Sequence, residues 1–147
     1  MNSQPLGIVL LADRHHGLTE SLRGLLETIF ASVVMVADEG SLFASAQLLQ
    51  PKAAVVDASL FPQGGVQWLA RLRKICPQML LVVLSVHDEL AMRRALLAAG
   101  TDCFVLKRDI PTKLLSAIEL ALHKKSTGDR QADATEKLAS LHENQIV

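Results

Sequence analysis

The chain is 147 residues long, the size of one ordinary domain, and 50% of its residues are hydrophobic against 20% that are charged. This composition excludes intrinsic disorder and supplies enough apolar surface for a core. The 15 basic and 15 acidic residues cancel, and the chain has 1 Trp and no Tyr. A protein that holds nucleic acid through a basic field or stacked aromatic side chains is therefore not expected.

The N-terminal apolar run, residues 6–12, is too short to cross a bilayer and follows no basic segment. Cys76 and Cys103 stand in apolar surroundings without the spacing of zinc ligands. We therefore expect a cytoplasmic protein that does not contact a membrane and that holds two buried free thiols.

Five short apolar runs predict five β-strands. Most of them lack the alternation of polar and apolar residues that marks a strand with one wet face, so both faces of the sheet are expected to be covered, as in parallel sheets. The predicted strands are residues 6–12, 32–37, 52–58, 79–86 and 103–107.

After each run, apolar residues recur three or four positions apart, which predicts five helices. The periodic segments are residues 18–29, 42–49, 66–75, 90–99 and 114–122. Gly100 stands where a left-handed residue would end the fourth helix, and Pro111 falls in the first turn of the fifth. This alternation predicts a doubly wound α/β domain, whose ligand site lies beyond the carboxyl ends of the strands.

We assign residues 1–125 to this domain and residues 126–147 to a C-terminal tail or linker, because the composition becomes polar there. Ala134, Leu138 and Leu141 form a weak apolar stripe in this tail. A short docking helix and a frayed linker both remain open for it.

Polar side chains stand at or just past the ends of four predicted strands, namely Asp13, Asp57, Ser85 and Lys107. Because these ends converge in a doubly wound sheet, the four side chains are expected in one cleft. Carboxylates hold divalent cations, while lysine and serine contact phosphoryl oxygens. The set favours a phosphoryl-transfer site, although any one of these residues alone is more typical of an ordinary strand end.

The order and spacing of these residues resemble the receiver domain of bacterial two-component response regulators, especially receivers that precede helix-turn-helix outputs. The resemblance covers residues 6–123 and rests on the segments VLLADRHH, AAVVDASLFPQGG, VVLSVHDE and ALLAAGTDCFVLKRD. It implies a flavodoxin-like fold, in which a five-stranded parallel sheet of order 2-1-3-4-5 carries helices on both faces.

The resemblance also implies a role for each site residue. Asp57 would be the nucleophile that accepts a phosphoryl group, Lys107 would pair with the resulting acyl phosphate, and Ser85 would bind a phosphoryl oxygen. Asp13, Asp57 and the backbone of Ser59 would hold Mg²⁺.

By the same resemblance, Ser85 and Phe104 would form a conformational switch, although a Phe in a short apolar strand is by itself typical of a core. The implied partners are a sensor histidine kinase or phosphotransfer protein and an effector protein. Arg93 and Arg94 mark a partner surface on the fourth helix, and a homodimer through the fourth and fifth helices is one option. Without the family, such charges indicate only a solvated face.

Arg14 departs from the family pattern, which has two adjacent acids after the first strand. With Asp13, Asp57 and Lys107 it makes a site of no net charge, which argues against tight Mg²⁺ binding. Two interpretations stay open. Either Arg14 pairs with Asp57 and makes a phosphorylation-independent pseudo-receiver module, or it points to solvent and a weakened metal site still works.

A phosphatase with an aspartate nucleophile would need an acid two residues after Asp57, where Ser59 stands. We therefore expect a phosphoacceptor signalling domain with at most slow self-dephosphorylation, and no enzyme. His15 and His16 are expected in a solvated loop, because adjacent histidines without a third spaced ligand seldom form a metal site. Trp68 is expected to pack in the core.

Overall fold

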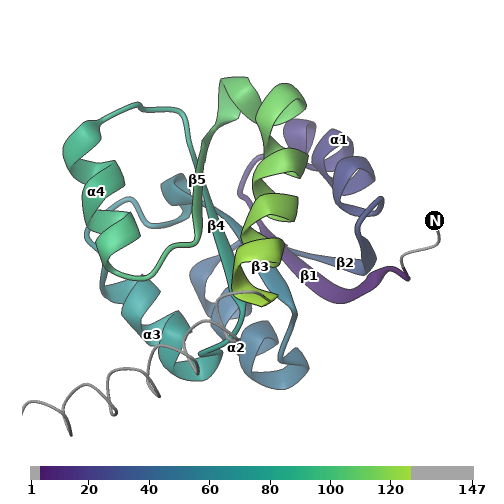
Figure 1. Ribbon diagram of the computed structural model, residues 1–147. Helices are drawn as coiled ribbons and strands as arrows, with labels where there is room; N and C mark the ends of the chain where they lie inside the picture. The colour runs from purple at the N-terminus through teal and green to yellow at the C-terminus, as the bar shows by residue number, and fades with distance from the viewer. Residues whose placement is uncertain (1–3, 127–147) are drawn as a thin grey trace, which may run out of the picture.

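Five parallel strands form one sheet in the order β2-β1-β3-β4-β5 (Figure 1). The computed structural model describes residues 4–126, without the side chains of residues 16–18. The strands are β1 Leu6–Ala12, β2 Phe30–Val36, β3 Ala53–Asp57, β4 Leu80–Ser85 and β5 Cys103–Leu106. The predicted flavodoxin-like α/β fold and the predicted strand order are confirmed.

Helices cover both faces of the sheet, which explains why the strands are almost continuously apolar. They are α1 His16–Leu26, α2 Glu39–Leu49, α3 Gln67–Ile75, α4 Leu90–Ala98 and a C-terminal helix at residues 110–126. The first and last of these pack on one face, and α2, α3 and α4 on the other. Pro111 lies in the first turn of the C-terminal helix, as predicted.

Alternate residues of each strand enter the two cores. In β1, for instance, Leu10 faces the core under α2 and α3, whereas Leu11 faces the core under α1 and the C-terminal helix. Trp68 lies in the first of these cores, where its ring stacks on Phe61 with the centroids 4.3 Å apart. The expected packing role of Trp68 is confirmed, and Cys76 and Cys103 are the expected buried free thiols.

Most predicted bounds lie within two residues of the observed ones. The start of α2, at Glu39 instead of residue 42, and both ends of the C-terminal helix, at 110–126 instead of 114–122, differ by more. The boundary between α1 and β2 also shifts. β2 starts at Phe30, two residues before the predicted strand, and α1 ends at Leu26, well before the last apolar position of its period. The reason is Ile29, which has left the helix and accepts a backbone hydrogen bond of 2.9 Å from Leu6 at the start of β1. Pairing with β1 therefore determines where α1 ends and β2 begins, and this boundary cannot be seen in the helical period of the sequence.

Gly100 follows α4 with φ +115°, as expected of a residue that ends a helix in the left-handed region. The Arg73 side chain of α3 packs against it, and a Cβ at position 100 would lie 3.3 Å from the Arg73 Nε. The guanidinium donates hydrogen bonds to the Gly100 carbonyl at 2.7 and 3.0 Å, to Asp102 at 2.6 Å and to the Met79 carbonyl. Arg73 thus links α3 to the start of β4 and to the turn before β5.

Within residues 4–126 we find no helix that is both long enough and apolar enough to cross a bilayer. Apart from residue 126, the predicted tail with Ala134, Leu138 and Leu141 lies outside the described residues. The predicted domain boundary at residue 125 stays a prediction.

Candidate functional site

The carboxyl ends of β1, β3, β4 and β5 meet at one edge of the sheet. Asp57 is the last residue of β3 and is paired in register with Leu84, the residue before Ser85. Asp13 and Lys107 directly follow β1 and β5. The Lys107 ammonium donates a hydrogen bond to Asp57 Oδ2 and lies 3.9 Å from Asp13 Oδ2. Residues that are 50 positions apart in the chain therefore form one ionic cluster.

Asp57 is almost completely enclosed and has a partner for each carboxylate oxygen. Its side chain is 2% exposed, Oδ1 accepts a 3.0 Å hydrogen bond from the Ser59 N–H, and Oδ2 contacts Lys107. Burial acts to raise the pKa of Asp57, but the Lys107 ammonium and the Ser59 N–H outweigh it and hold the pKa below its ordinary value. Asp57 is therefore an ionised carboxylate at neutral pH, the form in which it is a nucleophile.

Asp13 is less well satisfied. Its Oδ1 accepts a 2.9 Å hydrogen bond from the His15 N–H, whereas Oδ2 is buried and has no hydrogen-bond partner among the described groups. Burial raises the pKa of Asp13, the His15 N–H opposes this, and the neighbouring Asp57 carboxylate adds to the rise. A buried acceptor without a donor is suited to a cation.

Ser85 is buried at the end of β4, next in register to Leu106. Its hydroxyl is engaged by its own loop, because Oγ donates to the His87 carbonyl and accepts from the His87 N–H, both at 3.1 Å. Ser85 thus lies at the expected edge of the sheet, with a hydroxyl that has to leave His87 before it can donate to another group.

Arg14 is exposed, and the cation that contacts Asp57 is Lys107. The pairing of Arg14 with Asp57 that one interpretation required does not occur in the structure. The backbone bends at Arg14, whose side chain is exposed, while the side chain of Asp13 is enclosed beside Lys107. Arg14 therefore acts on the site only through solvent, where its charge is screened.

His15 lies beside the site. The residue is exposed, as expected, but one donor atom each from Asp13, His15 and Asp57 lies within 4.8 Å of the others. The sequence did not suggest this proximity, because adjacent histidines without a third spaced ligand are typical of a solvated loop. The available signal was its place in the same short loop as Asp13, two residues further on.

These donors fit a divalent cation. The unpartnered Asp13 Oδ2 and the cluster of two carboxylates and one imidazole are the observations that support this fit. The Ser59 backbone, which the resemblance placed among the ligands, lies at the same site and donates its N–H to Asp57. Asp13, Asp57 and the Ser59 backbone as Mg²⁺ ligands stay a prediction.

The residues expected to act as switch and partner surface lie beside this edge. Phe104 in β5 is half-buried, and the Arg93 guanidinium of α4 lies 5.5 Å from the centroid of its ring. Arg93 and Arg94 are both exposed. The aromatic side chain thus has contact with a helix whose outer face is open to solvent.

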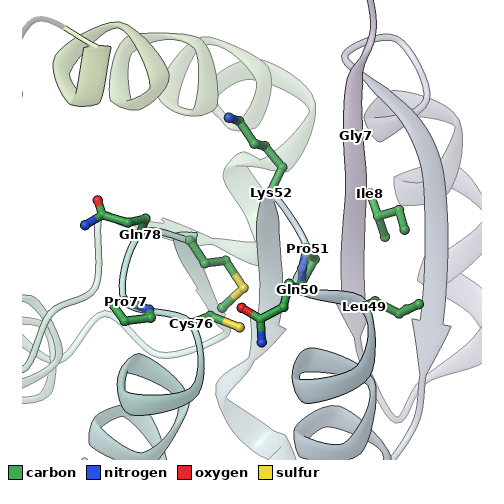
Figure 2. A pocket seen from close by; sticks show the side chains of 10 residues that line it. Gly7, Ile8, Leu49, Gln50, Pro51, Lys52, Cys76, Pro77 and Gln78 are labelled. Carbon is green, nitrogen blue, oxygen red and sulfur yellow. The ribbon is translucent and has the colours of Figure 1, made fainter.

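A separate pocket of about 490 Å³ lies at the opposite edge of the sheet, before the strands begin (Figure 2). The loops after α2 and α3 line it with Gln50, Pro51, Cys76 and Pro77, and Lys52 supplies its charge. No carboxylate is among its described lining residues. This pocket has no part in the cluster around Asp57.

Comparison with known proteins identifies the family. The family model of the response regulator receiver domain matches residues 9–119. A search of curated proteins finds no match. Among solved structures, a CheY-like response regulator receiver domain protein from Methanospirillum hungatei JF-1 is 24% identical with a TM-score of 0.74, and the alignment covers 84% of this chain and 98% of that one.

Two further structures are similar. A two-component response regulator of the LuxR family from Aurantimonas sp. SI85-9A1 is 25% identical with a TM-score of 0.71, covering 89% of this chain and 97% of that one. A response regulator from Burkholderia pseudomallei, solved with a phosphorylated aspartic acid, a calcium ion and citrate, is 20% identical with a TM-score of 0.68, covering 89% and 74%. Together with the fold and the family match, these findings establish that the chain belongs to the response regulator receiver domain family.

Proposed function

We propose that this receiver domain accepts a phosphoryl group on Asp57 and relays its presence as a conformational change. The observation that carries the proposal is the ion pair between buried Asp57 and Lys107, with Asp13 beside it, at the carboxyl edge of the sheet. A carboxylate attacks phosphorus only where nearby cations offset the charge of the incoming phosphoryl oxygens. Lys107 is placed to do so.

In the proposed step, a carboxylate oxygen of Asp57 forms a bond to phosphorus while the bond between phosphorus and a kinase histidine nitrogen breaks. The nitrogen keeps the electron pair of the broken bond. Lys107 stays near the new acyl phosphate, and the Ser59 N–H holds the other carboxylate oxygen at 3.0 Å, which orients the nucleophile. A divalent cation, when bound by Asp13 and Asp57, would supply further positive charge.

Ser85 and Phe104 are proposed to carry the signal outward. A phosphoryl oxygen on Asp57 would draw the Ser85 hydroxyl away from the His87 backbone and so pull the loop before α4 inward. Phe104, which contacts Arg93, would report that movement to the α4 surface.

We propose that this surface, which includes Arg93 and Arg94, binds an effector protein or a second copy of the chain. Charge reversal at both arginines is expected to abolish partner binding, and unchanged binding would exclude the surface.

A hydrolytic function has less support. Ser59 occupies the position where an aspartate-dependent phosphatase needs a general acid, and it presents only its N–H to Asp57. The Burkholderia pseudomallei relative was solved with its aspartic acid in the phosphorylated form, which agrees with a role as acceptor. Receiver domains are in general signalling domains, and we assign this chain to that role in the cytoplasm.

The test is incubation with a small phosphodonor such as acetyl phosphate, followed by intact mass measurement. We expect the mass to rise by one phosphoryl group in the natural chain and not in Asp57→Ala. Asp88→Asn is the matched control, because Asp88 is an exposed acid near the same edge, 3.8 Å from Arg108, and should not alter the gain.

A phosphoryl gain that persists in Asp57→Ala would contradict the assignment of the acceptor. No gain under any divalent cation would instead favour the phosphorylation-independent interaction module. The sequence-based reason for that second candidate is Arg14, but Arg14 is exposed and Lys107 is the cation at Asp57, so the structure gives it no added support.

A further inference from the structure

Two side chains of the segment between β1 and α1, those of Asp13 and His15, lie close to each other. His15 has extended backbone angles, φ −106° and ψ 110°, and donates its N–H to Asp13 Oδ1. The chain bends at Arg14, and this hydrogen bond closes a turn between the residues on either side of it. Asp13 and His15 are on the side of the cluster, and the exposed Arg14 is not.

The donor atoms on that side are close enough for one ion. A divalent metal binds carboxylate oxygen and imidazole nitrogen at about 2.0–2.2 Å, so two donors on opposite sides of it are separated by roughly 4.2 Å. The donors of Asp13, His15 and Asp57 already lie within 4.8 Å of one another. Small side-chain rotations would bring them into coordination range, and His15 is exposed and free to make them.

Asp13 provides the second, independent observation. Its side chain is completely enclosed, and its Oδ2 has no hydrogen-bond partner in the described structure. Lys107 is 3.9 Å away, beyond hydrogen-bond range, and its ammonium is committed to Asp57. A buried carboxylate oxygen without a donor, on a side chain that has a ligand atom within 4.8 Å of ligand atoms of His15 and Asp57, is a vacant acceptor suited to a cation.

The chemistry of these donors selects among ions. Mg²⁺ is a hard ion that prefers oxygen ligands, and here the two carboxylates are partly neutralised by Lys107. Imidazole contributes no negative charge, but it binds Co²⁺, Ni²⁺ and Zn²⁺ well. A set of two carboxylates and one imidazole thus favours a transition ion over Mg²⁺.

We propose that His15 is a metal ligand, and that Asp13, His15 and Asp57 together bind a divalent first-row transition ion in preference to Mg²⁺. The inference rests on the proposed function, because it names the ion that would bind at the proposed phosphorylation site. His15 then supplies to this pocket the third ligand that Arg14 cannot supply.

The experiment is titration of the full chain with Co²⁺ and, separately, with Mg²⁺ by calorimetry, together with the visible absorption of bound Co²⁺. We expect Co²⁺ to bind at least about tenfold more tightly than Mg²⁺. His15→Ala should weaken Co²⁺ by about tenfold or more, alter its absorption spectrum and leave the Mg²⁺ affinity nearly unchanged. The substitution removes an exposed side chain and keeps the backbone N–H that Asp13 accepts.

His87→Ala is the matched control, because His87 is exposed in the loop after β4 and is not among the clustered donors. It should bind Co²⁺ as the natural chain does. The proposal is overturned if His15→Ala retains the Co²⁺ affinity, if His87→Ala loses as much as His15→Ala, or if Mg²⁺ binds as tightly as Co²⁺.

The phosphodonor assay separates this inference from the proposed function. If Asp57 gains a phosphoryl group with Mg²⁺ while His15→Ala leaves Co²⁺ binding intact, only the metal inference fails. If Co²⁺ binds through His15 while no ion supports phosphorylation, only the proposed function fails.

Discussion

Lys107 gives its hydrogen bond to Asp57 and stands 3.9 Å from Asp13, so one ammonium serves two buried carboxylates unequally. The pKa values of the two acids therefore shift in opposite directions. The pKa of Asp57 lies below its ordinary value, and that of Asp13 lies above it. This inequality leads to two predictions on stability.

Lys107→Ala is expected to lower the free energy of unfolding by about 3 kcal/mol at pH 7, because it leaves a buried carboxylate without its cation. The Asp57 pair stabilises the fold above the unfolded pKa of a carboxyl, and that stabilisation is lost as the pH falls through the lower pKa of folded Asp57. The difference between variant and natural chain should therefore shrink in acid. Urea unfolding at neutral pH and near pH 3 measures both effects.

Lys113→Ala is the control for this variant. Its side chain is 67% exposed in a 3.6 Å pair with Asp109, so its removal should cost well under about 1 kcal/mol. Equal losses in the two variants would show that burial of the Asp57 pair is irrelevant to stability.

Asp13→Asn is expected to stabilise the fold at neutral pH by about 1 kcal/mol, since it removes a buried charge whose Oδ2 has no donor. The sign follows from the raised pKa of Asp13: folded Asp13 binds its proton more tightly than unfolded Asp13, so ionisation of this group costs stability as the pH rises. Melting temperatures of the two chains should converge in acid. A lower melting temperature for Asp13→Asn at pH 7 would contradict this account.

Arg73→Lys is expected to lower the free energy of unfolding by about 2 kcal/mol, because a lysine cannot reproduce the hydrogen bonds to Gly100, Asp102 and Met79 at once. Arg73 and Asp102 are 19% and 22% exposed, so solvent replaces the lost bonds only in part. Arg23→Lys, in an exposed pair with Glu27, should be nearly neutral. Denaturant unfolding of both variants gives the comparison, and a neutral Arg73→Lys would refute the linking role.

Arg14→Asp is expected to raise the Mg²⁺ affinity roughly tenfold at low salt, since it changes the charge beside Asp13 by two units. Arg14 is exposed, so the gain should fall as salt is added. Calorimetric titration at two ionic strengths measures it. Arg23→Asp makes the same charge change on α1 and is the control. An equal gain in Mg²⁺ affinity in both variants would mean that the net charge of the protein, and not the position of Arg14, controls Mg²⁺ binding.

The amino-acid sequence by itself was sufficient for the alternation of strands and helices and for the edge at which Asp57, Lys107, Asp13 and Ser85 gather, whereas the order of the sheet came from the resemblance to receiver domains. The alternation and the edge both follow from local signals: continuous apolar runs, helical periods and polar residues at strand ends. Parallel pairing then brings those ends to one edge without further information.

Only the tertiary structure decided which charged groups touch. Lys107 rather than Arg14 contacts Asp57, a ligand atom of His15 lies within 4.8 Å of ligand atoms of Asp13 and Asp57, and Arg73 reaches Gly100 and Asp102 across 27 and 29 positions. Such contacts depend on the direction of a side chain and on the distance between separate elements, and neither is written in a local pattern of polarity. The physical reason is that side-chain direction depends on the local backbone conformation, such as the bend at Arg14, so of two neighbouring charges Asp13 enters the site and Arg14 faces solvent.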